Sequence, residues 1–221
     1  MMGAFRAAAA AIAFCAGSGA LAQDSHDWSG FRVGVIGAGF VGHASDIPDG
    51  APPAAFGISG AMLGVMGRFD FDFGRLVAGI GVDWTYNTVG GGYTGNPNSG
   101  TFHIDHTTSV LFRVGYGAGR NLVYVQAGFN FSRVTTSGGP TASQDTDTVW
   151  FHSGLSQGYG RHFGAGVEHA FNRWVAGFVE YRHVFVGDEL IDLGPTNPGT
   201  AHFVAAGGHT IRAGVTLRLG R

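Results

Sequence analysis

The sequence predicts an all-β fold, an eight-stranded antiparallel up-and-down transmembrane barrel with short periplasmic turns and long extracellular loops. Apolar residues recur at every second position through most of the chain, which is the period of a strand with two different faces. Short and long connections between these segments alternate strictly, as they do in bacterial outer-membrane barrels. Only 13% of the residues are charged and 40 of the 221 are glycine, so little charge remains to coat a surface in water.

Residues 1–22 are predicted to be a signal peptide, which leaves 23–221 as the barrel domain. A short positive segment precedes an apolar run over 7–15, and Ala20-Leu21-Ala22 supplies the small residues of a cleavage site. We therefore expect export and cleavage before Gln23. An alanine-rich first helix is the alternative interpretation. The sequence after the signal holds no cysteine and no apolar stretch long enough for a transmembrane helix.

Eight segments show the alternation in chain order. They run over 28–42, 57–70, 74–87, 102–117, 120–134, 149–171, 173–186 and 207–220. Tight turns are expected near 71–74, 117–119 and 171–173. Connections rich in Gly, Pro, Asn, Ser and Asp are expected over 43–56, 88–101, 135–148 and 187–206. An even strand count places both termini on the periplasmic side.

The polar faces of these strands are sparse and rich in glycine. They carry Arg32, Arg68, Asp83, Arg113, Gln126, Glu168, Glu180, Arg182, Arg212 and Arg218. So few groups cannot coat an aqueous exterior, but they can fill the narrow interior of an eight-stranded barrel, where glycines leave room for long side chains. We therefore expect buried arginine–carboxylate pairs inside the barrel. The aromatic residues expected near strand ends, as interfacial girdles, are Trp84, Tyr86, Tyr116, Trp150, Tyr159 and Trp174.

One motif suggests a different protein class. Residues 37–42 read G-x-G-x-x-G directly after an apolar run, as in dinucleotide-binding folds. Such a fold needs a helix to begin at the third glycine, but the following residues hold three prolines within a short run. The glycines also continue the period-two pattern of one strand face. The sequence therefore favours a strand here and predicts no cofactor.

The histidines suggest two further sites. His103 and Asp105 share a predicted face but His106 points to the other, so three-ligand zinc coordination is disfavoured. His183 and Glu180 are an odd number of positions apart, so they point to opposite faces of the predicted strand, and no serine lies near them in sequence. This arrangement disfavours a serine hydrolase triad. We expect no catalytic, cofactor-binding or metal residues, and we expect Glu180 to pack with Arg182 inside the barrel.

Several segments resemble the opacity-type, or outer-membrane immunogenic, porin-family proteins of alphaproteobacteria. They are "DWSGFRVGVIGAG" (27–39), "FGRLVAGIGVDW" (73–84), "GRNLVYVQAGF" (119–129), "GAGVEHAFNRWVAGFVEYRHVFVGD" (164–188) and "GHTIRAGVTLRL" (208–219). The resemblance implies an eight-stranded barrel in the outer membrane with loops exposed as surface antigens, and roles in envelope integrity or adhesion. These barrels commonly end on an aromatic residue, whereas this sequence ends on Arg221.

The expected function is that of a structural or surface protein of the cell outer membrane that catalyses no reaction. A small porin-like diffusion channel is the alternative, and a barrel that hydrolyses or transfers lipid acyl chains is the lower alternative. The expected partners are outer-membrane lipid and lipopolysaccharide, the barrel assembly machinery, and a host or surface ligand bound through the loops. A formal net charge of −2 gives no basic surface for nucleic acid.

Overall fold

The computed structural model describes residues 26–48, 54–94, 98–140, 145–150, 160–192 and 201–220. Its elements are β1 (Gly30–Pro48), β2 (Ala54–Asp72), β3 (Leu76–Thr94), β4 (Asn98–Ala118), β5 (Asn121–Pro140), β6 (Asp145–Trp150), β7 (Gly160–Ala170), β8 (Val175–Asp192) and β9 (Ala201–Leu219). The described residues form no helix long and apolar enough to cross a membrane.

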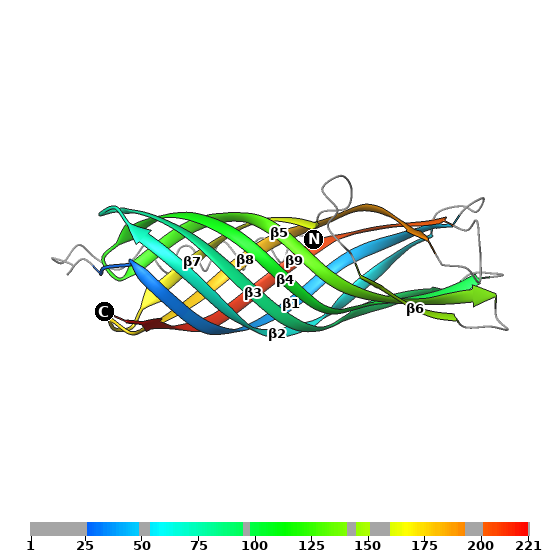
Figure 1. Cartoon of the computed structure of the whole chain (residues 1–221), viewed down its shortest axis with the longest axis horizontal. Coiled ribbons are helices and arrows are strands. Elements are labelled where there is room, and N and C mark those ends of the chain that lie inside the picture. Colours follow the sequence, from blue (N-terminus) through cyan, green and yellow to red (C-terminus); the bar gives the residue numbers. More distant parts are fainter. Residues whose placement is uncertain are drawn as a thin grey trace, which may run out of the picture.

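The strands form one closed antiparallel wall. The strands from β1 to β5 pair in sequence order, as do β7, β8 and β9, and the β1–β9, β4–β5 and β5–β7 pairings complete the ring. Two strands share a single position: β7 pairs with β5 along 121–130, and the short β6 pairs with β5 along 133–138. The nine strands therefore occupy eight positions, and the predicted eight-stranded barrel is confirmed (Figure 1).

The strands are strongly tilted around the barrel axis, as Figure 1 shows. Following the register once around the wall from Val33 leads to His43, ten residues further along β1 (33 to 43). A stagger of this kind is the geometric condition for closing a twisted sheet. It also decides which inward side chains from distant strands lie at one level of the lumen.

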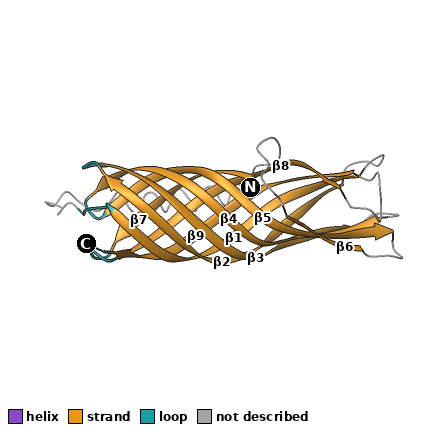
Figure 2. Cartoon of the chain, in the orientation of Figure 1, coloured by secondary structure: helices purple, strands orange, loops and turns teal. Residues whose placement is uncertain are grey.

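The short turns lie at the same end of the barrel as the start of β1 and the end of β9. The turns cover 73–75, 119–120 and 171–174, close to their predicted positions. Figure 2 shows these turns at the end of the barrel where β1 begins and β9 ends. Gly74 and Gly119 have positive φ angles of 93° and 59°, a conformation that glycine adopts without steric cost.

The predicted extent of the long loops is wrong. Most residues expected in those loops extend the strands instead, so β1 continues to Pro48 and β2 begins at Ala54. The strand ends were predicted only from where the apolar alternation stops. Backbone hydrogen bonding between strands does not require apolar alternation, so paired strands continue beyond it as long hairpin arms. The segment expected as one strand over 149–171 is described as β6 and β7, and 151–159 lie outside the described residues.

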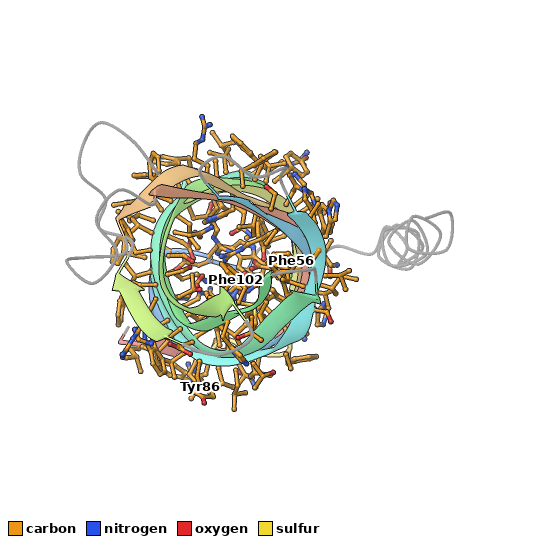
Figure 3. All side chains as sticks on the ribbon, turned by 90° about the vertical axis from the view of Figure 1, so that its right-hand side faces the viewer. Phe56, Tyr86 and Phe102 are labelled. Carbon is orange, nitrogen blue, oxygen red and sulfur yellow. The ribbon has the colours of Figure 1, made fainter. Side chains whose placement is uncertain are left out.

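The outward face of the wall is apolar and exposed. Side chains that are more than half exposed include Val35, Leu63, Val65, Phe112, Val125 and Ile211. Four predicted girdle aromatics, Trp84, Tyr86, Tyr116 and Trp174, are also outward and 41–59% exposed, and Figure 3 shows Tyr86 outside the ring. Trp84 and Tyr86 lie within the longer β3 instead of near its end. The side chain of Trp150 and all of Tyr159 lie outside the described part of the chain.

Candidate functional site: the charged interior of the barrel

The short-turn mouth of the lumen is closed by the residues that precede β1. The backbone N–H of Trp28 donates to Asp72 Oδ2 at 2.9 Å, and the N–H of Asp72 donates to Ser29 Oγ at 3.0 Å. These bonds hold the Trp28 ring inside the mouth, where it is 1% exposed and packs in one apolar cluster with Val77 and Leu122. The chain segment 26–29 therefore seals the base of the barrel.

Above this mouth lies the turn-side cluster, which we define as Arg32, Arg68, Asp70, Arg113 and Glu168. Arg113 holds Asp70 with two parallel hydrogen bonds, Nε to Oδ1 at 2.8 Å and Nη2 to Oδ2 at 2.6 Å, and donates to Glu168 Oε2 at 2.9 Å. Glu168 also accepts a short hydrogen bond from Arg68 and lies 3.5 Å from Arg32 Nη1. All five side chains are buried. With three arginines and two carboxylates, the cluster has one excess positive charge.

The next level of the lumen holds the loop-side cluster, which we define as Asp83, Glu180, Arg182 and Arg212. Arg182 Nη2 lies 2.9 Å from both Asp83 Oδ2 and Glu180 Oε1. Arg212 bridges the same two carboxylates at 3.1 and 3.3 Å. These four charges come from β3, β8 and β9 and are also buried. Two cations and two anions make this cluster neutral.

Tyr124 on β5 joins the two clusters. Its ring lies 4.9 Å from the guanidinium carbon of Arg113, and its hydroxyl donates to Glu180 Oε2 at 2.8 Å. A Cβ atom at Gly166 would stand 2.6 Å from the Tyr124 hydroxyl, and one at Gly79 would stand 2.1 Å from Asp70 Oδ1. Glycine at these two positions therefore provides the space that the charged network occupies, as the glycine-rich polar faces predict.

Toward the loop end the lumen lining changes from charged to apolar. The loop-side apolar cluster comprises Phe40, Ala44, Ile58, Val89, Phe102 and Ile104, each at most 8% exposed, with Phe56 packed against them. The rings of Phe56 and Phe102 contact each other edge to face, 6.3 Å apart. Figure 3, viewed from the loop end, shows both rings inside the barrel wall. The interior is thus filled by three successive layers: the Trp28 mouth, the ion network and this apolar cluster.

The predicted polar lining is confirmed with one exception. Nine of the ten predicted residues are buried in the interior: Arg32, Arg68, Asp83, Arg113, Gln126, Glu168, Glu180, Arg182 and Arg212. Arg218 instead lies at the mouth, where its guanidinium donates to Asp27 Oδ2 at 2.8 Å. Partial burial opposes ionisation of Asp27, but this hydrogen bond prevails and lowers the pKa of its carboxyl group.

Asp70 and His162 are two of the lumen residues that the predicted lining did not include. Asp70 has the same parity as Arg68 in "RFDFD", so the alternation could have identified it. His162 is fully buried, with Nδ1 2.8 Å from Asn130 Oδ1. It lies in the segment predicted as one strand over 149–171, where no alternation was assigned.

The G-x-G-x-x-G segment is part of a strand. Residues 37–42 lie within β1, and Gly37 and Gly39 face outward with open space where a Cβ would be. Gly42 faces inward, where a Cβ would approach the Gly207 carbonyl oxygen to 2.2 Å. No helix begins at this point, so the geometry of a pyrophosphate loop is not formed.

The predicted faces of the histidine segment need one correction. A bulge between Ile104 and His106 shifts the register of β4. It places His106 on the outer face with His103, where the His106 ring lies 6.2 Å from that of Trp84. Asp105 is paired with Arg133 at 3.7 Å. Within the described ranges, no group of three or more His, Cys, Asp or Glu residues is arranged to hold a metal ion.

The Glu180–His183 pair is separated by the barrel wall, as the sequence parity predicts. Glu180 is 4% exposed and faces the lumen, whereas His183 lies on the outer side beside His209. Glu180 contacts Arg182 at 2.9 Å, so its predicted role in interior packing is confirmed. The described hydrogen bonds of histidine side chains join them to arginine, asparagine, tyrosine or histidine partners.

The fold has solved counterparts, although the sequence matches no protein-family model and no curated protein. The outer membrane protein OprG from Pseudomonas aeruginosa aligns with a TM-score of 0.52 at 11% identity, covering 90% of this chain and 100% of that one. The attachment invasion locus protein Ail of Yersinia pestis aligns at 0.44 with 14% identity, covering 86% and 99% of the two chains. Neisserial surface protein A aligns at 0.43 with 16% identity, covering 86% and 98%. The chain therefore has the fold of a solved outer-membrane barrel.

Proposed function

We propose that this protein is a surface barrel of the bacterial outer membrane whose lumen is closed, so that it contributes to envelope integrity or adhesion and does not conduct. The observation that carries the proposal is the filled interior. Five arginines and four carboxylates cross the lumen in two connected clusters, and an apolar cluster follows them toward the loop end. An eight-stranded barrel has interior space for side chains and little more.

The distribution of polarity supports a place in the membrane. Large apolar side chains cover the outside of the wall, and the buried interior holds the charges, which is the reverse of a protein folded in water. A continuous apolar exterior of this kind requires lipid around it. The described pairings close the ring where β7 lies between β5 and β8, so the strands leave no open edge along that part of the wall, which is the condition for strands to cross hydrocarbon.

The long hairpin arms support a role at the cell surface. The arms of β1 and β2 pair as far as Asp46 and Ala54, well beyond the aromatic residues on the outer face. The signal peptide predicted over 1–22 and the family resemblance are consistent with export to the outer membrane. Lipopolysaccharide, the barrel assembly machinery and a surface ligand bound through the loops remain the partners that we propose.

Single-channel recording in a planar bilayer tests whether the lumen is closed. We expect no conductance steps from the refolded wild-type barrel, with far-UV circular dichroism and protease protection in liposomes confirming folding and insertion. Steady, reproducible steps from inserted wild-type protein would overturn the closed-lumen proposal in favour of the porin-like channel.

Paired variants sharpen this recording because the Trp28 mouth, the ion network and the loop-side apolar cluster lie in series. Replacing Glu180 and Arg182 together by serine removes one charge of each sign, and replacing Phe56 and Phe102 by serine weakens the apolar cluster. We expect both double variants and the quadruple variant to stay silent, because the turn-side cluster and the Trp28 mouth persist in all of them. Conductance by either double variant would show that a single barrier closes the lumen.

A further inference from the structure

An unusual group of side chains lies on the outer face of β8 and β9. His183 and His209 are directly opposite each other in the register of these strands. Their Nδ1 atoms are 3.1 Å apart, and the hydroxyl of Tyr181 lies 2.5 Å from the same Nδ1 atom of His209. His209 Nδ1 therefore lies within 3.1 Å of two further potential donor atoms, the Tyr181 hydroxyl oxygen and His183 Nδ1, outside the barrel wall.

Hydrogen bonding alone does not satisfy this arrangement. A neutral imidazole Nδ1 carries either one proton or one lone pair, so it acts as a donor or as an acceptor. His209 Nδ1 faces both the Tyr181 hydroxyl and His183 Nδ1, and it cannot complete good hydrogen bonds with both. A cation between the donor atoms would use the lone pairs of both nitrogens at once.

We infer that His183 and His209, beside the phenol of Tyr181, form a binding site for a divalent transition-metal ion, with Cu²⁺ bound most tightly. Imidazole nitrogens bind such ions at about 2.0–2.1 Å. Two nitrogens at this distance from a common ion are about 2.9 Å apart at a right angle and about 3.4 Å apart at the tetrahedral angle. The observed 3.1 Å lies within this interval, and water completes the coordination.

The chemistry of the donor set selects the class of ion. The site has two neutral nitrogens and a phenol, without a carboxylate among its contacts. Ca²⁺ and Mg²⁺ require several oxygen ligands, whereas imidazole suits copper, zinc and nickel, of which Cu²⁺ is bound most strongly. No cysteine occurs in the described residues to offer a softer alternative.

Neighbouring rings hold the ligands in place. The ring of Phe185 meets that of His183 edge to face at 4.1 Å, and the rings of Tyr181 and His209 stack at 5.8 Å. Tyr181 is 42% exposed on the outer face, so the site lies outside the lumen and apart from the ion network. Because the two histidines come from adjacent strands, a bound ion would cross-link β8 to β9.

Titration of the folded barrel in detergent with Cu²⁺ alone tests the site. The titration is run at a pH above the ordinary histidine pKa of about 6.5. We expect the wild type to bind one more Cu²⁺ per chain than the variant with both His183→Ala and His209→Ala. Either single substitution should weaken binding by about tenfold or more, and Tyr181→Phe by a smaller factor. His169→Ala, an exposed histidine near the short turns, is the matched control and should bind as the wild type does.

Two measurements keep the inference open to refutation even if a variant folds poorly. The electron paramagnetic resonance spectrum of Cu²⁺ on wild-type protein should show coupling to two imidazole nitrogens, and bound Cu²⁺ should raise the thermal midpoint of unfolding. A spectrum without that coupling would overturn the site. Equal Cu²⁺ affinity in folded His183→Ala, His209→Ala and wild-type barrels would overturn it as well.

Discussion

The two ion clusters both bury arginines and carboxylates in the lumen, but their net charges differ. In the turn-side cluster one carboxylate, Glu168, contacts three arginines, and the cluster has one excess positive charge. In the loop-side cluster Glu180 and Asp83 share two arginines and the charges cancel. Burying an ion is costly unless opposite charge and hydrogen bonds surround it. The comparison teaches that two clusters with similarly buried side chains need not lose the same stability when one carboxylate is removed.

The largest expected effect follows from removing the carboxylate of the turn-side cluster. Glu168→Gln keeps the side-chain size but leaves three buried arginines facing Asp70 alone. We expect the free energy of unfolding to fall by about 3–5 kcal/mol, measured by equilibrium denaturation of the barrel in lipid vesicles.

Glu180→Gln is the matched change in the loop-side cluster. It leaves two arginines facing Asp83, so its excess charge is smaller and we expect a smaller loss of stability than for Glu168→Gln. Equal losses, or a larger loss for Glu180→Gln, would show that charge balance does not distinguish the clusters.

A smaller effect is expected where the clusters meet. Tyr124→Phe keeps the ring beside Arg113 but removes the hydrogen bond to Glu180 Oε2. Loss of a partner from a buried polar group costs about 1–3 kcal/mol. A double-mutant cycle with Glu180→Gln measures this link, and additive effects of the two substitutions would argue against it.

The smallest effect is expected at the exposed mouth, where Asp27 pairs with Arg218. Asp27→Asn should cost at most about 1 kcal/mol, because solvent screens such pairs. The pKa of Asp27 is lowered in the folded protein from 3.8. The contribution of ionised Asp27 to the free energy of unfolding is therefore present above pH 3.8 and is lost as the pH falls through the pKa of the folded state. Stability profiles of wild type and Asp27→Asn should converge in acid and at high salt. A difference that persists in acid would contradict this assignment.

Much of the candidate site could be predicted from the alternation of residues along single strands. The parity of Arg32, Arg182 and Arg212 places them in the lumen, because successive side chains of a strand point to opposite faces. The parity rule was less informative wherever the register shifts. The β4 bulge places His106 on the outer face, opposite to its predicted face. The strands also continue beyond the residues that alternate, so the alternation did not show where they end.

The sequence by itself determined that one face of each strand is apolar and the other sparse and charged, and hence that the chain closes into a barrel with charge inside. Only the tertiary structure decided which charges meet. Arg68 and Glu168 are a hundred residues apart, and Arg212 on β9 meets Asp83 on β3 across the lumen. These contacts depend on the stagger of the closed wall, a property of all the strand pairings together that no single segment encodes.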